Sequence, residues 1–526
     1  MSQTETPLKT PDGVARADGK EPRQRSVRVV MVGLMIAMLL AMLDNMIVGT
    51  AMPTIVGELG GLDHLSWVVT AYTLATAAST PVWGKLGDMY GRKGIFLTSI
   101  VLFLAGSAMS GASQSMDQLI TFRAIQGLGA GGLMVGVMAI IGEMIPPRER
   151  GKYQGLIAGV MAVAMIGGPL VGGSITDNWG WRWSFYINLP IGAVALAMVT
   201  IVLHLPKKRG QARIDYLGAA LLTVAITSLV LLTTWGGTQY AWGSVQIIGL
   251  LVLGLAALAA FLWAETRAAE PVMPLRIFRN GNFSLISLIG FLVGFTMFGA
   301  MTFLPLYQQT VQGASATNSG LLLLPLLLAM MVVSMVAGRF TTSTGKYKIF
   351  PIVGGGLMTV GLYLLSTMDV HTSRFTSGLF MAVLGAGMGC IMQTTMLVAQ
   401  NSVEMKDMGV GSSSATLFRT IGGSFGVSLF GALFAHKVQD GMSGKGSTAT
   451  SGGAQLDPAT IAKFPPALKD AYFHAVASGT HVVFFWGALV SVLGFLAAWF
   501  LVETPLRGAA GKSTEQEDAP LLADAV

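Results

Sequence analysis

Apolar runs of roughly 20 residues recur along this chain from residue 29 to residue 501, and they limit the fold more than any other feature. A helix of about 20 apolar residues is long enough to cross the hydrocarbon core of a bilayer. Hydrocarbon offers the backbone no hydrogen-bond partner, so each run must be helical. The alternating ten-residue segments of a membrane barrel are missing from the sequence. We therefore expect an all-α polytopic membrane protein.

The composition agrees with this expectation. The 526 residues are 52% hydrophobic and 11% charged, whereas soluble globular proteins carry about 25% charged residues. We predict about fourteen spans, at residues 28–50, 65–83, 94–113, 118–144, 153–176, 184–204, 216–234, 245–264, 283–305, 318–338, 349–367, 375–399, 410–435 and 480–502.

The distribution of cationic residues predicts the orientation. With the N-terminus inside, 25 of the 33 Lys and Arg residues fall on inner segments, as the positive-inside rule requires. An even number of spans then places both termini in the cytoplasm. We expect a multi-pass protein of the cell inner (plasma) membrane, and the Gly- and Ala-rich composition points to a bacterium. The long segment 436–479 is expected to be a flexible external loop with a short helix at 465–477.

Several function classes are disfavoured. The net charge of +7 reflects the loop bias, so no nucleic-acid partner is expected. The GxGxxG pattern at 127–132 follows no strand, and the GKS at 511–513 lacks the first P-loop glycine, so no nucleotide site is expected. One cysteine and six scattered histidines offer no metal constellation. We expect a monomer in the lipid bilayer that is not an enzyme and has no cofactor beyond a proton gradient.

Three landmarks repeat in one order. A glycine opens a charged turn at Gly84 and again at Gly338; LGAG follows at 128–131 and 384–387, and IGG at 166–168 and 421–423. Such repeats indicate a transporter built from two related halves. The predicted organisation is a disordered cytoplasmic tail at 1–27, a six-helix half at 28–204, a linker with two extra transmembrane helices at 205–281, a second six-helix half at 282–502 and a cytoplasmic tail at 503–526.

Five motifs in order resemble the major facilitator superfamily, and within it the 14-span drug:proton antiporters of the multidrug and antibiotic efflux branch. They are LDNMIVGTAMP at 43–53, GKLGDMYGRK at 84–93, RAIQGLGA at 123–130, GPLVGG at 168–173 and WRWSFYINLP at 181–190. The resemblance implies the major facilitator fold, with two pseudo-symmetric six-helix halves and, here, two inserted helices.

Asp44 and Arg123 are the candidates for proton coupling. Helical rise places both at roughly 22–24 Å from the inner face, and the family fold puts their spans around one cavity. An ionisable group inside a span is a functional candidate by default. Asp44 is interpreted as the proton carrier; a counter-charge to a cationic substrate and a helix-packing acid are the alternatives. The alternatives for Arg123 are a structural ion pair and a snorkelling residue.

The resemblance implies that the turn at 84–93 closes an inner gate, with Arg92 relaying to an acid at the inner end of span 4. The alternative is that these residues are hydrated charges at the inner face, which only determine the orientation of the chain in the membrane. The predicted gate residues are Gly84, Asp88, Gly91, Arg92 and Glu143. The second turn lacks an acid that matches Asp88, so gating control is expected to be asymmetric.

The span-5 motif is associated with antiporters, and its residues are Gly168, Pro169, Gly172 and Gly173. A kink that seals the outer side is the functional interpretation, and tight helix packing is the alternative. The second half has Leu379 and Ser424 where the first has Arg123 and Pro169, so proton chemistry should concentrate in the first half. Arg419 is an exception inside span 13, and we expect it to pair with backbone carbonyls or lipid phosphate.

Methionine and phenylalanine suit loose recognition of apolar molecules. The predicted lining of the substrate cavity is Met42, Met46, Phe291, Phe295, Phe298, Gln393 and Met396.

The sequence thus predicts proton-driven secondary active efflux of lipophilic small molecules, such as drugs or antibiotics, by alternating access. Two alternatives stay open. One is a proton-coupled importer or osmolyte carrier of the same fold. The other is a lipid-handling or receptor-like membrane protein in which the two extra helices bind a partner. A channel is disfavoured, since no ring of pore charges is visible.

Overall fold

The structure is a computed structural model of the whole chain. It describes residues 21–59, 65–145, 150–203, 215–236, 240–268, 270–314, 318, 321–442 and 464–506.

The first half is built from seven helices around the predicted repeat. They are α1 (Glu21–Leu59), α2 (Leu65–Tyr90), α3 (Arg92–Gly111), α4 (Met116–Met144), α5 (Arg150–Trp179), α6 (Trp183–Tyr186) and α7 (Asn188–Val202). The sixth span comprises the short α6 and α7, which are separated by the single residue Ile187, whose own backbone is helical.

Two inserted helices follow, α8 (Tyr216–Trp235) and α9 (Val245–Glu265), and then a 3₁₀ turn, η3 (Leu275–Arg279). The second half comprises α10 (Gly281–Thr310), α12 (Leu324–Thr344), α13 (Ile349–Ser366), α14 (Arg374–Asn401), the turn η4 (Met405–Asp407), α15 (Met408–Met442) and α17 (Pro466–Trp499).

The number of spans agrees with the prediction. Within the described residues, thirteen helical segments are long and apolar enough to cross a membrane. The 26-residue α2 is not among them, because polar residues interrupt its apolar sequence, but it packs along α4 inside the bundle. We count it as the fourteenth span.

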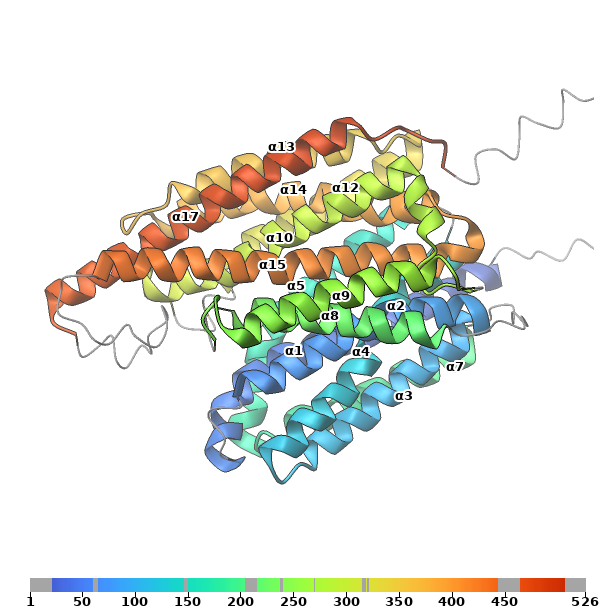
Figure 1. Cartoon of the computed structure of the whole chain (residues 1–526), viewed down its shortest axis with the longest axis horizontal. Helices are drawn as coiled ribbons and strands as arrows, with labels where there is room; N and C mark the ends of the chain where they lie inside the picture. Colours follow the sequence, from blue (N-terminus) through green and yellow to red (C-terminus); the bar gives the residue numbers. More distant parts are fainter. Residues whose placement is uncertain are drawn as a thin grey trace, which may run out of the picture.

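The two halves repeat the same packing. In the first half α4 packs against α2 and α3, and in the second α14 packs against α12 and α13; α1 lies on α5 as α10 lies on α15. Figure 1 shows the halves as two layers, with α8 and α9 packed together alongside them. The described chain begins and ends at the same end of the bundle (Figure 1), as an even number of spans requires. We call this the inner end, following the predicted orientation.

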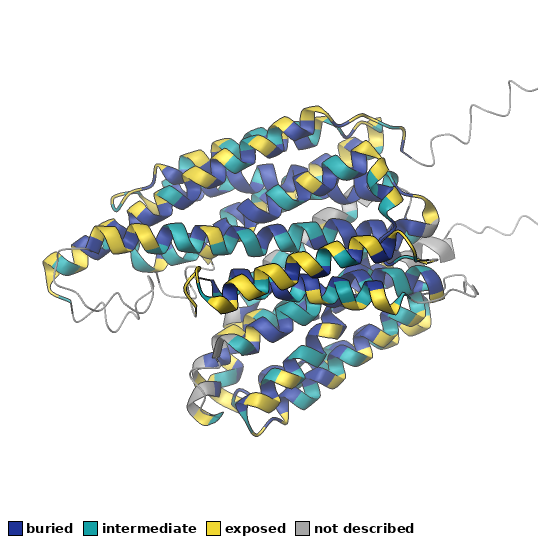
Figure 2. Ribbon diagram, in the orientation of Figure 1, coloured by how far each residue is buried: buried dark blue, intermediate teal, exposed yellow. Residues whose placement is uncertain are grey.

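The surface of the bundle is apolar where lipid would surround it. Figure 2 shows a continuous exposed face along α9. The exposed side chains of that face are large and hydrophobic, and they include Val245, Ile248, Leu251, Val252 and Leu255. A soluble protein rarely exposes so large an apolar patch. This surface fits a helix whose outer side faces hydrocarbon.

Helices extend further at three places than the sequence analysis predicts. α15 continues to Met442, into the predicted external loop 436–479. The helix predicted at 465–477 is present, but it is the first part of α17, which begins at Pro466 and runs on into the last span. These extensions bury Val438 and Met442 of α15, and Ala471 and Tyr472 of α17. The paired apolar faces explain why the chain stays helical beyond the membrane. α1 begins at Glu21, within the predicted tail; the rest of that tail, residues 443–463 and residues 507–526 lie outside the described residues.

Candidate functional site

Asp44 of α1 and Arg123 of α4 meet inside the first half. The Arg123 guanidinium donates to Asp44 Oδ2, and both side chains are fully buried. The two residues are 79 positions apart in sequence, so only the packing of α1 on α4 brings them together. A buried carboxylate and a buried cation are tolerated at this depth because each compensates the other.

Two further donors complete the shell of the Asp44 carboxylate. Gln126 Nε2 donates to Asp44 Oδ1 at 2.8 Å, and Asn188 Nδ2 donates to the same oxygen at 2.7 Å. Asn188 Nδ2 also lies 2.9 Å from the Ser107 hydroxyl oxygen. The carboxylate oxygens accept all three hydrogen bonds, so this one side chain ties α1 to both α4 and α7.

Arg123 is held from several sides. Its Nη1 lies 3.0 Å from Gln126 Oε1 and its Nη2 lies 3.3 Å from Asn45 Oδ1. Its guanidinium carbon lies 4.0 Å from the centre of the Tyr72 ring, a cation–π distance. Tyr72 is fixed in turn by its hydroxyl, which donates to the Ala41 carbonyl at 3.2 Å. Several side chains thus hold the Arg123 guanidinium, so its position does not depend on one contact alone.

The glycine-rich run of α4 explains how the helices come so close. A methyl group on Gly127 would lie 2.4 Å from the Tyr72 carbonyl oxygen, and one on Gly129 would lie 2.4 Å from the Phe103 nitrogen. Only glycine fits at both positions, so α4 packs directly on α2 and α3. The GxGxxG pattern serves helix packing in this structure.

The predicted gate residues also converge, at the inner end. Gly91 has a φ of 95°, a left-handed conformation that suits glycine, and it turns the chain from α2 into α3. This turn sets Arg92 beside Asp88, with Nη2 2.9 Å from Oδ1, and beside Glu143, with Nε 3.2 Å from Oε2. Arg92 also donates to the Ala139 carbonyl. The turn is therefore anchored to the end of α4.

The gate joins the two halves. The Val410 backbone N–H donates to Asp88 Oδ2 at 3.0 Å, so the carboxylate caps the first turn of α15. A methyl group on Gly84 would lie 2.6 Å from Ser413 Oγ, and one on Gly409 would lie 2.6 Å from the Asp88 carboxylate. In addition, Gln400 Nε2 donates to the Met138 carbonyl at 3.2 Å. The structure thus shows an inner end that is closed.

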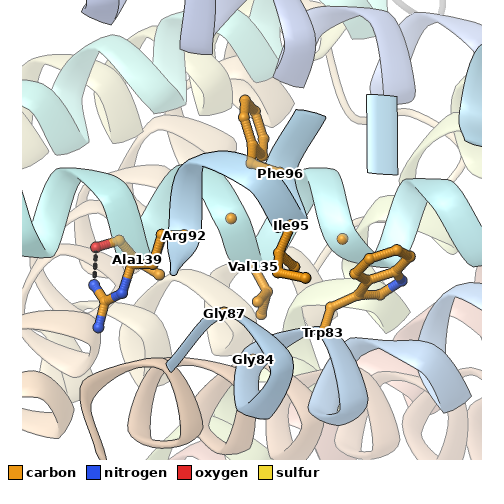
Figure 3. A pocket seen from close by; sticks show the side chains of 10 residues that line it. Trp83, Gly84, Gly87, Arg92, Ile95, Phe96, Val135 and Ala139 are labelled. Atoms are coloured by element: carbon orange, nitrogen blue, oxygen red, sulfur yellow. Dashed lines mark hydrogen bonds between the residues drawn. The ribbon is translucent and has the colours of Figure 1, made fainter. Parts of the chain in front are cut away.

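A small cavity of about 10 Å³ lies behind this contact, between α2, α3 and α4. Figure 3 shows it framed by Trp83, Arg92 and Phe96, with the dashed bond from Arg92 to Ala139 at its edge. This volume is close to that of a single water probe. It suits a turn that packs with little free space and does not suit a drug-sized ligand.

The segment between α9 and α10 adds a second connection across the inner end. Lys85, in the first charged turn at 84–93, lies 2.9 Å from Glu270. Arg276 of η3 lies 2.8 Å from Asp407 of η4. The buried Glu265 carboxylate accepts from the backbone N–H groups of Val272 and Met273, at 3.1 and 3.2 Å, and so fixes the segment to α9. This segment, 266–280, is called the connector below; it contacts both halves.

The second charged turn has different partners. The backbone N–H of Tyr347 donates to Glu503 at 2.8 Å, and the Thr504 N–H donates to the Tyr347 hydroxyl at 2.9 Å. Glu503 and Thr504 follow α17 in the same half, so this turn is tied within its own half. Among the described contacts, only the first turn has an acid that caps a helix of the other half. The predicted asymmetry is therefore present in the geometry.

The span-5 motif lies in α5, and one of its glycines makes a close contact. A methyl group on Gly168 would lie 2.3 Å from the Met46 Cβ atom, so Gly168 lets α5 pack closely on α1. Gly172 is buried, and its carbonyl accepts from Thr176 at 2.7 Å. Gly173 has open space around it, and the Pro169 side chain lies outside the described residues. The contact at Gly168 fits the packing interpretation.

The predicted cavity residues divide into two groups. Met42 and Phe291 are partly exposed, and Met46 and Phe298 are 40% and 38% exposed. The other three are buried in this conformation, and their place in the substrate cavity stays a prediction: Phe295, Gln393 and Met396. The Phe295 ring packs edge-on against Phe430, at 5.0 Å, which explains its burial.

The sequence analysis missed three residues of the Asp44 site: Tyr72, Gln126 and Asn188. Gln126 and Asn188 lie inside the motifs quoted above, and each is an amide within an apolar stretch. That pattern is a usable signal, since a buried amide needs a partner. Nothing in the sequence singles out Tyr72, because its contact with Arg123 depends on the packing of α2 on α4.

Comparison with known proteins agrees with the geometry. The family model for the Major Facilitator Superfamily matches residues 34–427. The chain is 40% identical to the uncharacterized MFS-type transporter Rv1877 of Mycobacterium tuberculosis, over 96% of this chain and 74% of that protein. It is 34% identical to the multidrug transporter protein MdtP of Bacillus subtilis, over 96% of this chain and 98% of that protein.

Solved structures show the same fold. The human organic anion transporter MFSD10 superposes with a TM-score of 0.61 and 14% identity, over 91% of this chain and all of that chain. The proton:xylose symporter XylE superposes with a TM-score of 0.58 and 14% identity, over 92% of this chain and 97% of that chain. The chain therefore belongs to the major facilitator superfamily, as a membrane transporter with multidrug-efflux relatives and not as an enzyme.

Proposed function

We propose that this transporter exports lipophilic small molecules in exchange for protons, with both of its termini in the cytoplasm. The observation that carries the proposal is the Asp44 carboxylate, fully buried inside the first half and bound by Arg123, Gln126 and Asn188. A titratable group at this depth, with three neutral or cationic donors, is suited to binding and releasing a proton. Relatives named as multidrug transporters support the efflux direction.

The mechanism uses the closed inner gate as its starting state. A proton that reaches Asp44 neutralises the carboxylate and weakens its ion pair with Arg123. Asp44 lies on α1 and Arg123 on α4, so loss of the pair alters the packing of α1 on α4. α4 carries Glu143 and Ala139, which hold Arg92 in the gate. Protonation is thus coupled to the gate through one rigid helix, and the halves then rock about the substrate.

The test is transport by purified protein in liposomes. Asp44→Asn should abolish proton-driven export of a fluorescent lipophilic substrate, because an amide cannot exchange a proton at this site. A protonophore should abolish export by the wild type. Asp117→Asn is the matched control, since Asp117 is an exposed acid at the start of the same helix, α4; it should export normally.

Two results would contradict the proposal. One is proton-driven export by Asp44→Asn at the wild-type rate. The other is export by the wild type that continues unchanged when the proton gradient has been collapsed.

A further inference from the structure

Arg419 is a cation in the middle of the second half that has no bonding partner among the described residues. It is the twelfth residue of α15, which begins at Met408, so it lies roughly 16 Å along the helix. In a hydrocarbon core about 30 Å thick, this is near the midplane. Within the described residues, the Arg419 guanidinium makes no hydrogen bond or ion pair, unlike that of Arg123. The expected pairing with backbone carbonyls is therefore not observed.

The position of Arg419 argues against lipid as its partner. The residue is partly exposed, and a bare guanidinium facing hydrocarbon at the midplane would be costly. Lipid phosphates lie at the membrane surface, beyond the reach of a side chain at this depth. A charged residue inside a span faces the bundle interior or a water-filled cavity. The exposure of Arg419 is thus best explained by a cavity between the helices.

One exposed aromatic ring, that of Phe298, lies next to Arg419. The helix α10 passes directly beside it, because a methyl group on Gly294 would lie 2.0 Å from the Arg419 carbonyl oxygen. The ring of Phe298, one turn further along α10, lies against Gly423, with Cδ2 2.6 Å from where a methyl group would stand. Gly423 is one turn beyond Arg419 on the same face of α15. An exposed ring and an unpaired cation therefore share one surface.

No carboxylate of the second half is placed to neutralise this charge. Among the described residues of α10, α12, α13, α14, α15 and α17, the acids are Asp440 and Asp470, both in the extensions beyond the membrane. Asp44 is already bound to Arg123. Among the described residues, neutralisation of this charge is therefore left to a molecule that enters the transporter.

We propose that Arg419 binds the acidic group of the exported substrate, a carboxylate or sulfonate, while Phe298 contacts the apolar body of that molecule. The preferred substrate is then an amphiphilic acid. This inference rests on the proposed function and names its substrate class. An arginine fork binds a carboxylate through two parallel hydrogen bonds, which supplies specificity as well as affinity.

The test compares an acid with its ester, so that only the charge differs. Binding of 1-pyrenebutyrate and its methyl ester is measured on the purified full-length protein in uncharged maltoside micelles. The wild type should bind the acid about tenfold to hundredfold more tightly than the ester, the range expected for a charge-assisted hydrogen bond. Arg419→Gln should remove this preference, and Arg419→Lys should retain part of it.

Transport in liposomes distinguishes substrate recognition from a purely structural role, because only recognition changes the export rates of an acid and a cation in opposite directions. Arg419→Gln should slow export of the acid and speed export of a lipophilic cation such as ethidium, because the repelling charge is gone. A packing defect would slow both. Thr420→Val is the matched control, a neighbour whose hydroxyl is already bonded to the Thr416 carbonyl; it should keep the acid preference.

Three results would overturn the inference: no preference for the acid in the wild type, an equal preference in Arg419→Gln, or displacement of the acid by micelles of anionic phospholipid. Should Arg419→Gln fail to purify as a single species, the same comparison is made with Arg419→Lys. Binding needs no proton gradient, so failure of proton-driven export with an intact acid preference would count against the proposed function alone.

Discussion

At the scale of single residues, the Asp44 site combines one acid with an unusually complete set of donors. Arg123, Gln126 and Asn188 come from two helices, α4 and α7, and converge on a carboxylate of α1. The Asp44 carboxylate thus joins three helices, α1, α4 and α7, through one side chain.

Glu58 gives a prediction about acid stability at the outer end of the same half. Hydrogen bonds from Arg182 and from the Trp181 indole hold the pKa of Glu58 below its ordinary value. A lowered pKa stabilises the folded state above the unfolded-state value, about 4.3, and this stabilisation is lost as pH falls through the folded-state value. We expect the melting temperature of Glu58→Gln to fall less than that of the wild type between pH 6 and pH 3.

The effect should be small, because the Glu58 side chain is half-exposed and solvent screens the pair. Asp117→Asn, another exposed acid of the same half, provides the comparison. Melting curves of Glu58→Gln and wild type that stay parallel over this pH range would show that the Glu58–Arg182 pair contributes nothing.

The sequence places Asp44 and Arg123 at one depth of the membrane, because the position of each residue within its apolar run fixes its depth. It does not predict the full shell. Asn188 lies 144 positions from Asp44, and only the packing of α1 on α7 brings the two side chains together. The buried Phe295 shows the same limit, since its burial depends on Phe430, 135 positions away.

At the scale of helices and segments, the connector gives the inserted helices a mechanical role at the gate. It is fixed to α9 through Glu265, to α2 through Glu270 and to the start of α15 through Arg276. α15 is the helix that Asp88 caps. A motion that separates α2 from α15 must therefore release at least one of the two connector ion pairs.

A charge exchange tests the connector. Lys85→Glu places two acids together and should slow export, because like charges push the connector away from α2. The double variant Lys85→Glu with Glu270→Lys should recover part of the loss, since it restores the pair in reverse. Partly exposed pairs contribute about 0.2–1 kcal/mol, so we expect changes of several-fold in the rate of export from liposomes. Lys346→Glu, an exposed cation of the second turn, is the control, and a double variant no better than Lys85→Glu would contradict the pairing.

At this scale the sequence predicts the number and order of the spans, because each is a long apolar run. It places helix ends less well where helices continue beyond the membrane. The extensions of α15 and α17 are stabilised by contact with each other, through Val438, Met442, Ala471 and Tyr472. A Gly- and Ser-rich segment between them masks that pairing in the sequence.

At the scale of the whole molecule, the described structure is closed at the inner end. The helices α5 and α12 pack on each other across the halves, and at the inner end α2 and α4 both contact α15. Ser413 lies in this contact and is buried. Its accessibility therefore reports the separation of the halves.

The variants Ser413→Cys and Ser343→Cys are made in a Cys390→Ala background, which lacks the single native cysteine. The Ser413→Cys thiol should react slowly with a membrane-impermeant maleimide added from the inner side. Ser343→Cys is the control, because Ser343 is exposed. We expect the Ser413 site to be roughly tenfold slower, since a gate closed by about 1.4 kcal/mol is open about a tenth of the time. Asp88→Asn should speed the reaction by removing the cap on α15. Equal rates at both sites would mean that the inner end is not closed in the membrane.

The unpaired charge of Arg419 has an electrical consequence for the complete cycle. Export of an acid with one negative charge moves net positive charge inward, and so does the entry of one proton. If each turnover exchanges one such acid for one proton, a net charge of +2 therefore enters the cell. Each elementary charge is worth about 2.3 kcal/mol at a potential of 100 mV, so the potential alone supplies about 4.6 kcal/mol. That free energy sustains a concentration ratio of roughly two thousand. Export of a monovalent cation against one proton would draw nothing from the potential, so the sign of the cargo decides whether voltage or only the pH difference drives this transporter.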